Sequence, residues 1–172
     1  TTSPSALGRP TKIHFAGEFP RQKIAGLNVL ATLDHTGEEA HETIEGRVAA
    51  FPVENQMFAD SGGVKLGLKQ AVGTAALTAN LVDMSLDVGL QSKFDHPDFT
   101  FEAQNAMVKD ILGSVLKGMP AVTMNAHVAG SWEHFNMNID SNLGSELSNG
   151  FQKQLQAKLG AAKAQLDSLV ND

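Results

Sequence analysis

The chain has 172 residues, 42% of them hydrophobic, and its 19 acidic and 13 basic residues give a net charge of −6. This length suits a single domain with its own core, and an acidic balance without a basic run argues against a nucleic-acid-binding protein. The absence of cysteine excludes disulfides, cysteine-ligated zinc and thiol chemistry, but it leaves the compartment open.

The first ten residues, TTSPSALGRP, are rich in Ser, Thr, Pro and Gly, and we expect them to form a flexible lead-in. They contain neither an initiator Met nor a charged and then apolar leader, which indicates a mature form or, as we favour, an excised piece of a larger protein. Residues 11–172 are expected to form a single β-rich domain. Their apolar stretches are well under the roughly 18 to 20 residues that span a bilayer, so no spanning segment is expected within them.

Segments in which apolar and polar residues alternate follow the lead-in, separated by turn-forming residues at spacings of about 8 to 12. This pattern predicts the strands of an antiparallel sheet, each with one apolar and one polar face. The clearest segments are 27–33, 64–70, 74–81, 84–91, 121–128 and 134–140.

Two other segments have helical periodicity. Met107, Ile111 and Val115 recur every fourth residue and predict a short amphipathic helix at about 103–118. A long helix is predicted at about 142–170, with Ser141 and Asn142 as N-cap candidates. Its apolar residues form an oblique stripe, which suits a helix lying across a twisted sheet: Leu143, Leu147, Phe151, Leu155, Leu159, Ala162, Leu166 and Leu169.

The sequence therefore predicts an α+β fold that is mainly antiparallel β, with a curved, gutter-like sheet and a short middle helix. The long C-terminal helix is expected to pack on the apolar face of the sheet, because a single sheet leaves that face open to water. Composition leaves two interpretations of the face open, a sealed core or a groove for an acyl chain. The candidate groove residues are Leu66, Leu68, Leu77, Leu81, Leu86, Val88, Leu90, Val122, Met124 and Met137.

One cluster is a candidate catalytic or metal-binding site, because Asp95, His96 and Asp98 lie close together in the segment KFDHPDFTF. A histidine with neighbouring carboxylates can bind a divalent metal or act in acid and base catalysis. Asp-His-Pro-Asp at the end of a strand is also ordinary turn chemistry, and we favour the turn. No serine lies in a G-x-S-x-G elbow, so we expect a protein that is not an enzyme, without catalytic residues, bound metal or cofactor.

The repeated strands of GVKLGLKQAVGTAALTANLVDMSLDVGLQSKF, followed by HFNMNIDSNLGSELSNGFQKQLQAKLGAAKAQL, resemble the C-terminal part of AsmA/TamB-like proteins of the bacterial envelope. The strand that leads into SNLGSELSNGFQKQLQAKL is similar to an uncharacterised AsmA-like family. The resemblance covers residues 60–172, and covers 11–59 more loosely.

The resemblance implies a non-enzymatic periplasmic domain, anchored to the inner membrane by an N-terminal transmembrane helix outside this sequence. It implies lipid handling or a structural role in the envelope, with phospholipid or acyl chains held along an apolar β-groove. The family supplies no catalytic residues.

Two alternatives remain open. In the first, the chain is an interaction module whose C-terminal helix continues past Asp172 as a coiled coil and mediates self-association. In the second, ranked lower, it is a metal-assisted hydrolase that uses Asp95, His96 and Asp98.

Overall fold

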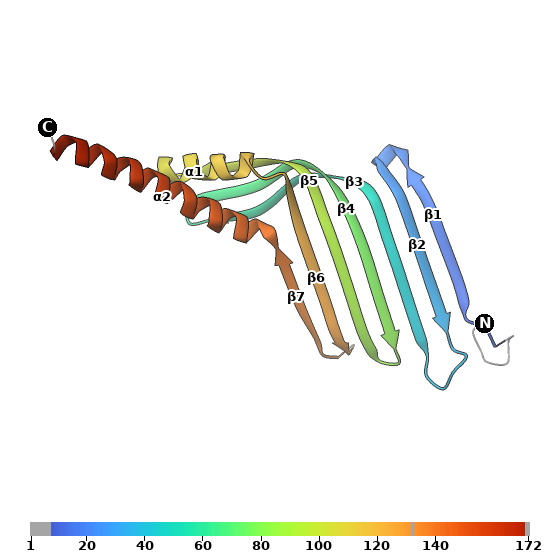
Figure 1. Cartoon of the computed structure of the whole chain (residues 1–172). Coiled ribbons are helices and arrows are strands. Elements are labelled where there is room, and N and C mark those ends of the chain that lie inside the picture. Colours follow the sequence, from blue (N-terminus) through green and yellow to red (C-terminus); the bar gives the residue numbers. More distant parts are fainter. Residues whose placement is uncertain (1–7, 132, 171–172) are drawn as a thin grey trace.

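The computed structural model describes residues 8–131 and 133–170, with the backbone alone at 166, 167, 169 and 170. Its strands form one seven-stranded antiparallel sheet in which chain order is also spatial order (Figure 1). The predicted fold class, mainly antiparallel β with a short helix and a C-terminal helix, is confirmed. Residues 1–7 of the expected lead-in lie outside the described residues.

The elements follow one another along the chain with short connections. The strands are β1 (Thr11–Phe19), β2 (Ile24–Asp34), β3 (His41–Ser61), β4 (Val64–Val82), β5 (Ser85–Ala103), β6 (Ala121–Ser131) and β7 (Phe135–Ser141). The helices are η1 (Pro20–Gln22, 3-10), α1 (Ala106–Lys117) and α2 (Asn142–Val170).

The central strands are longer than the sequence predicts, because segments 64–70 and 74–81 are one continuous strand, β4. The apolar residues of β4 occupy even positions at Leu66 and Leu68 and odd positions at Leu77 and Leu81. The pairing of β4 with β5 shifts between Leu68 and Val72. A bulge sets two residues of one strand against one of its neighbour, so it changes the phase of the alternation without ending the strand.

The pairing of β3 and of β5 with β4 is also irregular near this position along the strands. Phe51 of β3 pairs with Gly73 of β4, which pairs with Phe94 of β5, and the pairing is irregular beside this row. His96 of β5 has a φ of 48°, in the left-handed region. The bulges bend the sheet, and the far ends of β3, β4 and β5 curve toward the helices (Figure 1).

Gly73 allows an aromatic ring to lie across the sheet at the bend. A Cβ at this position would be 2.5 Å from Cζ of Phe51, so any other residue would displace that ring. The rings of Phe51 and Phe94 meet edge to face across β4, with centroids 6.3 Å apart. The contact ties β3 to β5 where the sheet changes direction.

The buried core lies at the bent end of the sheet. Within the described residues, the buried hydrophobic side chains are those of Leu66, Leu68, Ala71, Ile111, Leu116, Met119 and Val122. Leu66, Leu116, Met119 and Val122 form one cluster, and partly buried residues of β5, α1 and α2 pack against it: Phe94, Phe99, Phe101, Leu112, Leu143 and Leu147. The straight part of the sheet, toward the hairpin loops, is a single layer.

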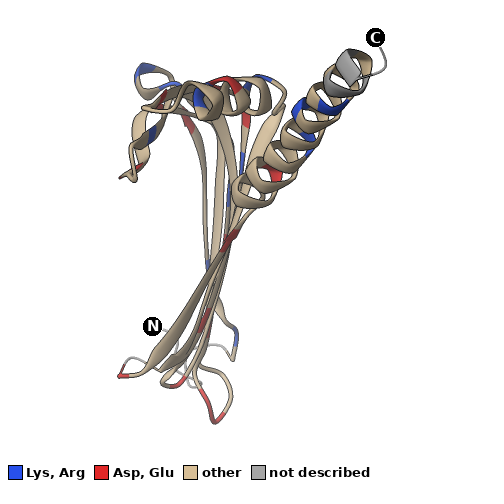
Figure 2. Ribbon diagram, turned by 90° about the vertical axis from the view of Figure 1, so that its left-hand side faces the viewer, with Lys and Arg blue, Asp and Glu red and all other residues tan. Residues whose placement is uncertain are grey.

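Helix α2 packs over the bent end by its first turns only. Gly150 lies against α1, where a Cβ would be 2.5 Å from Cγ2 of Val115. Further along, α2 extends past the edge of the sheet, and Leu155 and Leu159 are 39% and 61% exposed (Figures 1 and 2). The expected packing on the apolar face thus holds only near the helix start, because α2 begins at the edge strand and α1 occupies the bent end. Two stripe positions have side chains outside the described residues: Leu166 and Leu169.

Substitution of His96 tests the bulge in β5. His96→Gly is expected to preserve or slightly raise stability, because glycine adopts positive φ without a Cβ penalty. His96→Val is expected to lower the free energy of unfolding by about 1 to 2 kcal/mol, since the left-handed region brings Cβ too close to the following carbonyl oxygen. Urea denaturation followed by circular dichroism measures both variants, and equal stability of the two would contradict the left-handed conformation.

Candidate functional site: an uncovered apolar face and its pocket

Apolar side chains occupy one face of the sheet across all seven strands. Directly paired residues point to the same face, so each row of pairs can be followed from edge to edge. One row consists of Ile13, Ala31, Ile44, Ala79, Val88, Val128 and Met137. A second row consists of Phe15, Val29, Gly46, Leu77, Leu90, Ala126 and Ile139. We call the surface defined by these rows the apolar face.

The apolar face is open to solvent in the straight part of the sheet. On β1, Ile13 and Phe15 are 55% and 50% exposed, and on β7, Met137 and Ile139 are 64% and 56% exposed. The main contacts of α1 are with β5 and α2, and those of α2 are with α1 and β6, so the helices leave these rows uncovered. Monomeric soluble proteins rarely expose an apolar patch larger than a few hundred Å², which makes this face a candidate binding surface.

At the bent end, the apolar face leads into a pocket of about 340 Å³, which we call the apolar pocket. Its volume falls in the roughly 300 to 1,000 Å³ range of ligand sites. None of the described residues that line it is charged, and Ser141 contributes the one hydroxyl group among them. It is lined by Met57, Phe58, Leu68, Phe94, Pro97, Phe99, Val122, Met124, Ser141 and Leu143. Such a lining suits a hydrocarbon chain.

Asn142 holds the wall of the apolar pocket that comes from α2. Its Oδ1 accepts a hydrogen bond from the backbone N–H of Thr123 at 2.8 Å, and its Nδ2 donates to the carbonyl of Ala121 at 3.2 Å. The side-chain amide therefore continues the pairing with β6 after the backbone of β7 has ended. Ser141 Oγ accepts from the backbone N–H of Leu143 at 3.2 Å, as expected of a capping residue.

The predicted groove residues divide between the core and the apolar face. Three are buried at the bent end, where Leu68 and Val122 also line the apolar pocket: Leu66, Leu68 and Val122. The others lie on the apolar face or at its pocket: Leu77, Leu81, Leu86, Val88, Leu90, Met124 and Met137.

Some residues of the site were not predicted. Ile13 and Phe15 alternate with Lys12 and His14, a period-two signal that indicates β1. The two pocket residues from β3, Met57 and Phe58, come after one irregularity in the pairing and lie at the next, where alternation no longer predicts a face. The cross-strand bonds of Asn142 reach residues 19 and 21 positions earlier, beyond any local pattern.

The structure does not bring Asp95, His96 and Asp98 together as a metal site. Asp95 Oδ1 lies 2.7 Å from Lys93 Nζ, and Asp98 Oδ2 lies 3.8 Å from Lys69 Nζ. In the described part of the chain, no three His, Asp or Glu side chains are placed to hold a metal ion. The expected turn is also wrong, because these residues form a bulge inside β5, where the His96 N–H bonds to the Pro120 carbonyl. The hydrolase hypothesis therefore lacks its geometric basis.

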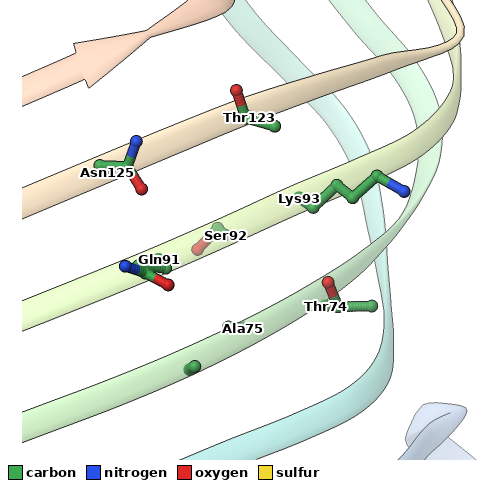
Figure 3. A pocket seen from close by; sticks show the side chains of 8 residues that line it. Thr74, Ala75, Gln91, Ser92, Lys93, Thr123 and Asn125 are labelled. Carbon is green, nitrogen blue, oxygen red and sulfur yellow. The ribbon is translucent and has the colours of Figure 1, made fainter.

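A second hollow, of about 440 Å³, lies on the opposite, polar face of the sheet (Figure 3). Its polar lining comes from β4, β5 and β6: Thr74, Gln91, Ser92, Lys93, Thr123 and Asn125. Because Lys93 is paired with Asp95, this hollow offers no free cation to an anionic ligand. Most of its lining residues are polar, whereas the lining of the apolar pocket is mainly hydrocarbon.

A third hollow, of about 460 Å³, lies at the hairpin end beside Glu38, Glu39 and His41. The Thr36 side chain lowers the pKa of Asp34 there, because its hydroxyl donates a hydrogen bond to Oδ1 at 2.6 Å. The Thr36 backbone N–H donates to the same oxygen at 3.0 Å and lowers the pKa further. The lining of this hollow is thus polar and rich in carboxyl groups, unlike that of the apolar pocket at the other end.

Comparison with models of known protein families, with curated proteins and with solved structures gives no match to this chain. Neither of the two α-helices, as far as they are described, combines the length and apolar content that a bilayer-spanning helix needs. The geometry of the apolar face and its pocket is therefore the feature of this chain that indicates a function.

Asn142→Ala tests how the pocket wall is held. The variant leaves a partly buried N–H and C=O of β6 without their partner, which costs about 1 to 3 kcal/mol of stability. Amide hydrogen exchange at Thr123 is expected to become faster. Asn138→Ala, at an exposed position on β7, is the matched control and is expected to stay within about 0.5 kcal/mol of the parent. Equal effects of the two substitutions would contradict the anchoring role.

Proposed function

We propose that this chain is a non-enzymatic lipid-binding domain, which holds an acyl chain along the apolar face with its end in the apolar pocket. The observation that carries the proposal is the continuity between the uncovered apolar face and a pocket without charged lining. A hydrocarbon chain needs smooth apolar walls and few polar contacts.

The dimensions fit a lipid tail. From Leu86 to Phe94 the apolar face follows β5 for eight residue steps, or about 27 Å at about 3.4 Å per residue. One leaflet of a bilayer has a hydrocarbon depth of about 15 Å, half of the roughly 30 Å core. An acyl chain can therefore lie along the face with its end at the bend.

The free energy also favours a guest molecule on this face. Covering an exposed Leu, Ile, Met or Phe side chain contributes about 1.5 to 3 kcal/mol per fully buried residue. Both edge strands carry such residues at half exposure or more, and the half-buried central rows lie between them. A lipid chain would cover the central rows, while its headgroup would remain at the solvated margin of the sheet.

The resemblance to AsmA/TamB-like proteins supports the same function and extends it. Under that resemblance the domain would lie in the periplasm, with the full-length protein anchored to the inner membrane, and its ligand would be a phospholipid. A role in lipid transport or in envelope structure follows from the same proposal.

Charge placed on the apolar face is expected to abolish binding. Leu77→Glu and Val88→Glu should each weaken binding of a fluorescent fatty acid at least tenfold, because a carboxylate cannot be covered by hydrocarbon without a large desolvation cost. Thr78→Glu, on the opposite face of the same strand, is the matched control and should bind like the parent. Fluorescence titration measures all four proteins, with circular dichroism to verify folding. Absence of binding by the parent chain, or equal binding by all variants, would overturn the proposal.

A further inference from the structure

The outer segment of α2, which we define as residues 155–165, is a helix without a tertiary partner in the part of the chain that the structure describes. Every residue of this segment is exposed, whereas the inner turns pack on α1 through Gly150 and through a hydrogen bond from Gln154 to Ser114. Isolated helices shorter than about 12 to 15 residues are only marginally stable in water. A packing partner would therefore stabilise the outer segment.

The apolar residues of the outer segment form a narrow seam. Leu155, Leu159 and Ala162 are spaced by four and then three residues, the spacing at which helices pair in coiled coils. A helix that lies on a bilayer surface presents a broad face of large apolar side chains to the lipid. The outer segment has only two large apolar side chains among Gln, Ala and Lys, so the seam favours another helix over a membrane surface.

The charges beside the seam restrict the partner. Lys158 and Lys163 flank the seam, Lys153 precedes it, and the sequence has no acidic residue between Glu146 and Asp167. The chain as a whole has a net charge of −6, so the segment is a local basic region, seen as blue bands on α2 in Figure 2. Flanking charges select coiled-coil partners through ion pairs.

A second copy of this chain is a poor partner for the seam. In a parallel pair, residues five positions apart on the two helices meet beside the seam, so Lys158 of each helix would face Lys163 of the other. These two like-charge contacts oppose the self-association that the coiled-coil hypothesis predicts. An acidic helix would instead form two ion pairs.

We propose that the outer segment of α2 is a docking site for an amphipathic helix of another polypeptide, with Asp or Glu on both sides of its apolar seam. This inference concerns a different surface from the apolar face and does not depend on lipid binding. The pairing would order α2 beyond the sheet and connect the domain to a second protein.

Two synthetic four-heptad peptides test the inference, both with Ile and Leu at the seam positions and with either Glu or Lys at every flanking position. Fluorescence anisotropy at low salt is expected to show at least tenfold tighter binding of the Glu peptide by the whole chain. The preference should reverse in the Lys158→Glu/Lys163→Glu variant, and Leu159→Asp should abolish binding. Lys153→Glu, which reverses the charge of one lysine away from the seam, should retain the preference of the parent.

Three results would overturn the inference. The first is the absence of a preference between the two peptides. The second is sedimentation of the parent chain as a dimer that Leu159→Asp dissociates, which would assign the seam to self-association. The third is binding to phosphatidylglycerol vesicles without binding to the Glu peptide, which would assign it to a membrane surface.

Discussion

A single-layer sheet with one apolar face must have that face covered, and this constraint explains most of the molecule. At the bent end the protein covers this face with its own helices, because Leu66, Leu116 and Val122 are buried where α1 and the first turns of α2 pack. At the straight end, nothing within residues 8–131 and 133–170 forms a second layer over the rows of Leu, Val, Ile and Met side chains. Because the sheet is covered at one end and open at the other, its apolar face is a candidate binding site.

The bulges make this division possible. Without a change of phase, the apolar residues of β4 and β5 on the two sides of the bend would fall on opposite faces of the sheet. The shifts near Leu68 and His96 keep them on one face, so that the open rows, the apolar pocket and the buried core form one continuous surface. Asn142 then fixes α2 against β6 and completes the pocket wall.

Much of the fold could be predicted from the sequence because alternation and helical periodicity are local signals. They predicted segments of β2, β4, β5, β6 and β7, both α-helices, and the apolar face near Leu77 and Val88. The continuity of β4 through its bulge could not be predicted, since a change of phase looks like the end of one strand and the start of another. The direction of α2 depends on Asn142 bonds to a distant strand, and the pocket depends on residues brought together by the bend.

Site-specific photocrosslinking tests the central claim most directly. A benzophenone amino acid in place of Met137 lies on the apolar face, and the same group in place of Asn138 lies on the opposite face of the same edge strand. After irradiation with phospholipid, mass spectrometry is expected to find a lipid adduct at position 137 and none at position 138. Equal labelling at the two positions, or labelling at neither, would contradict a lipid-binding apolar face.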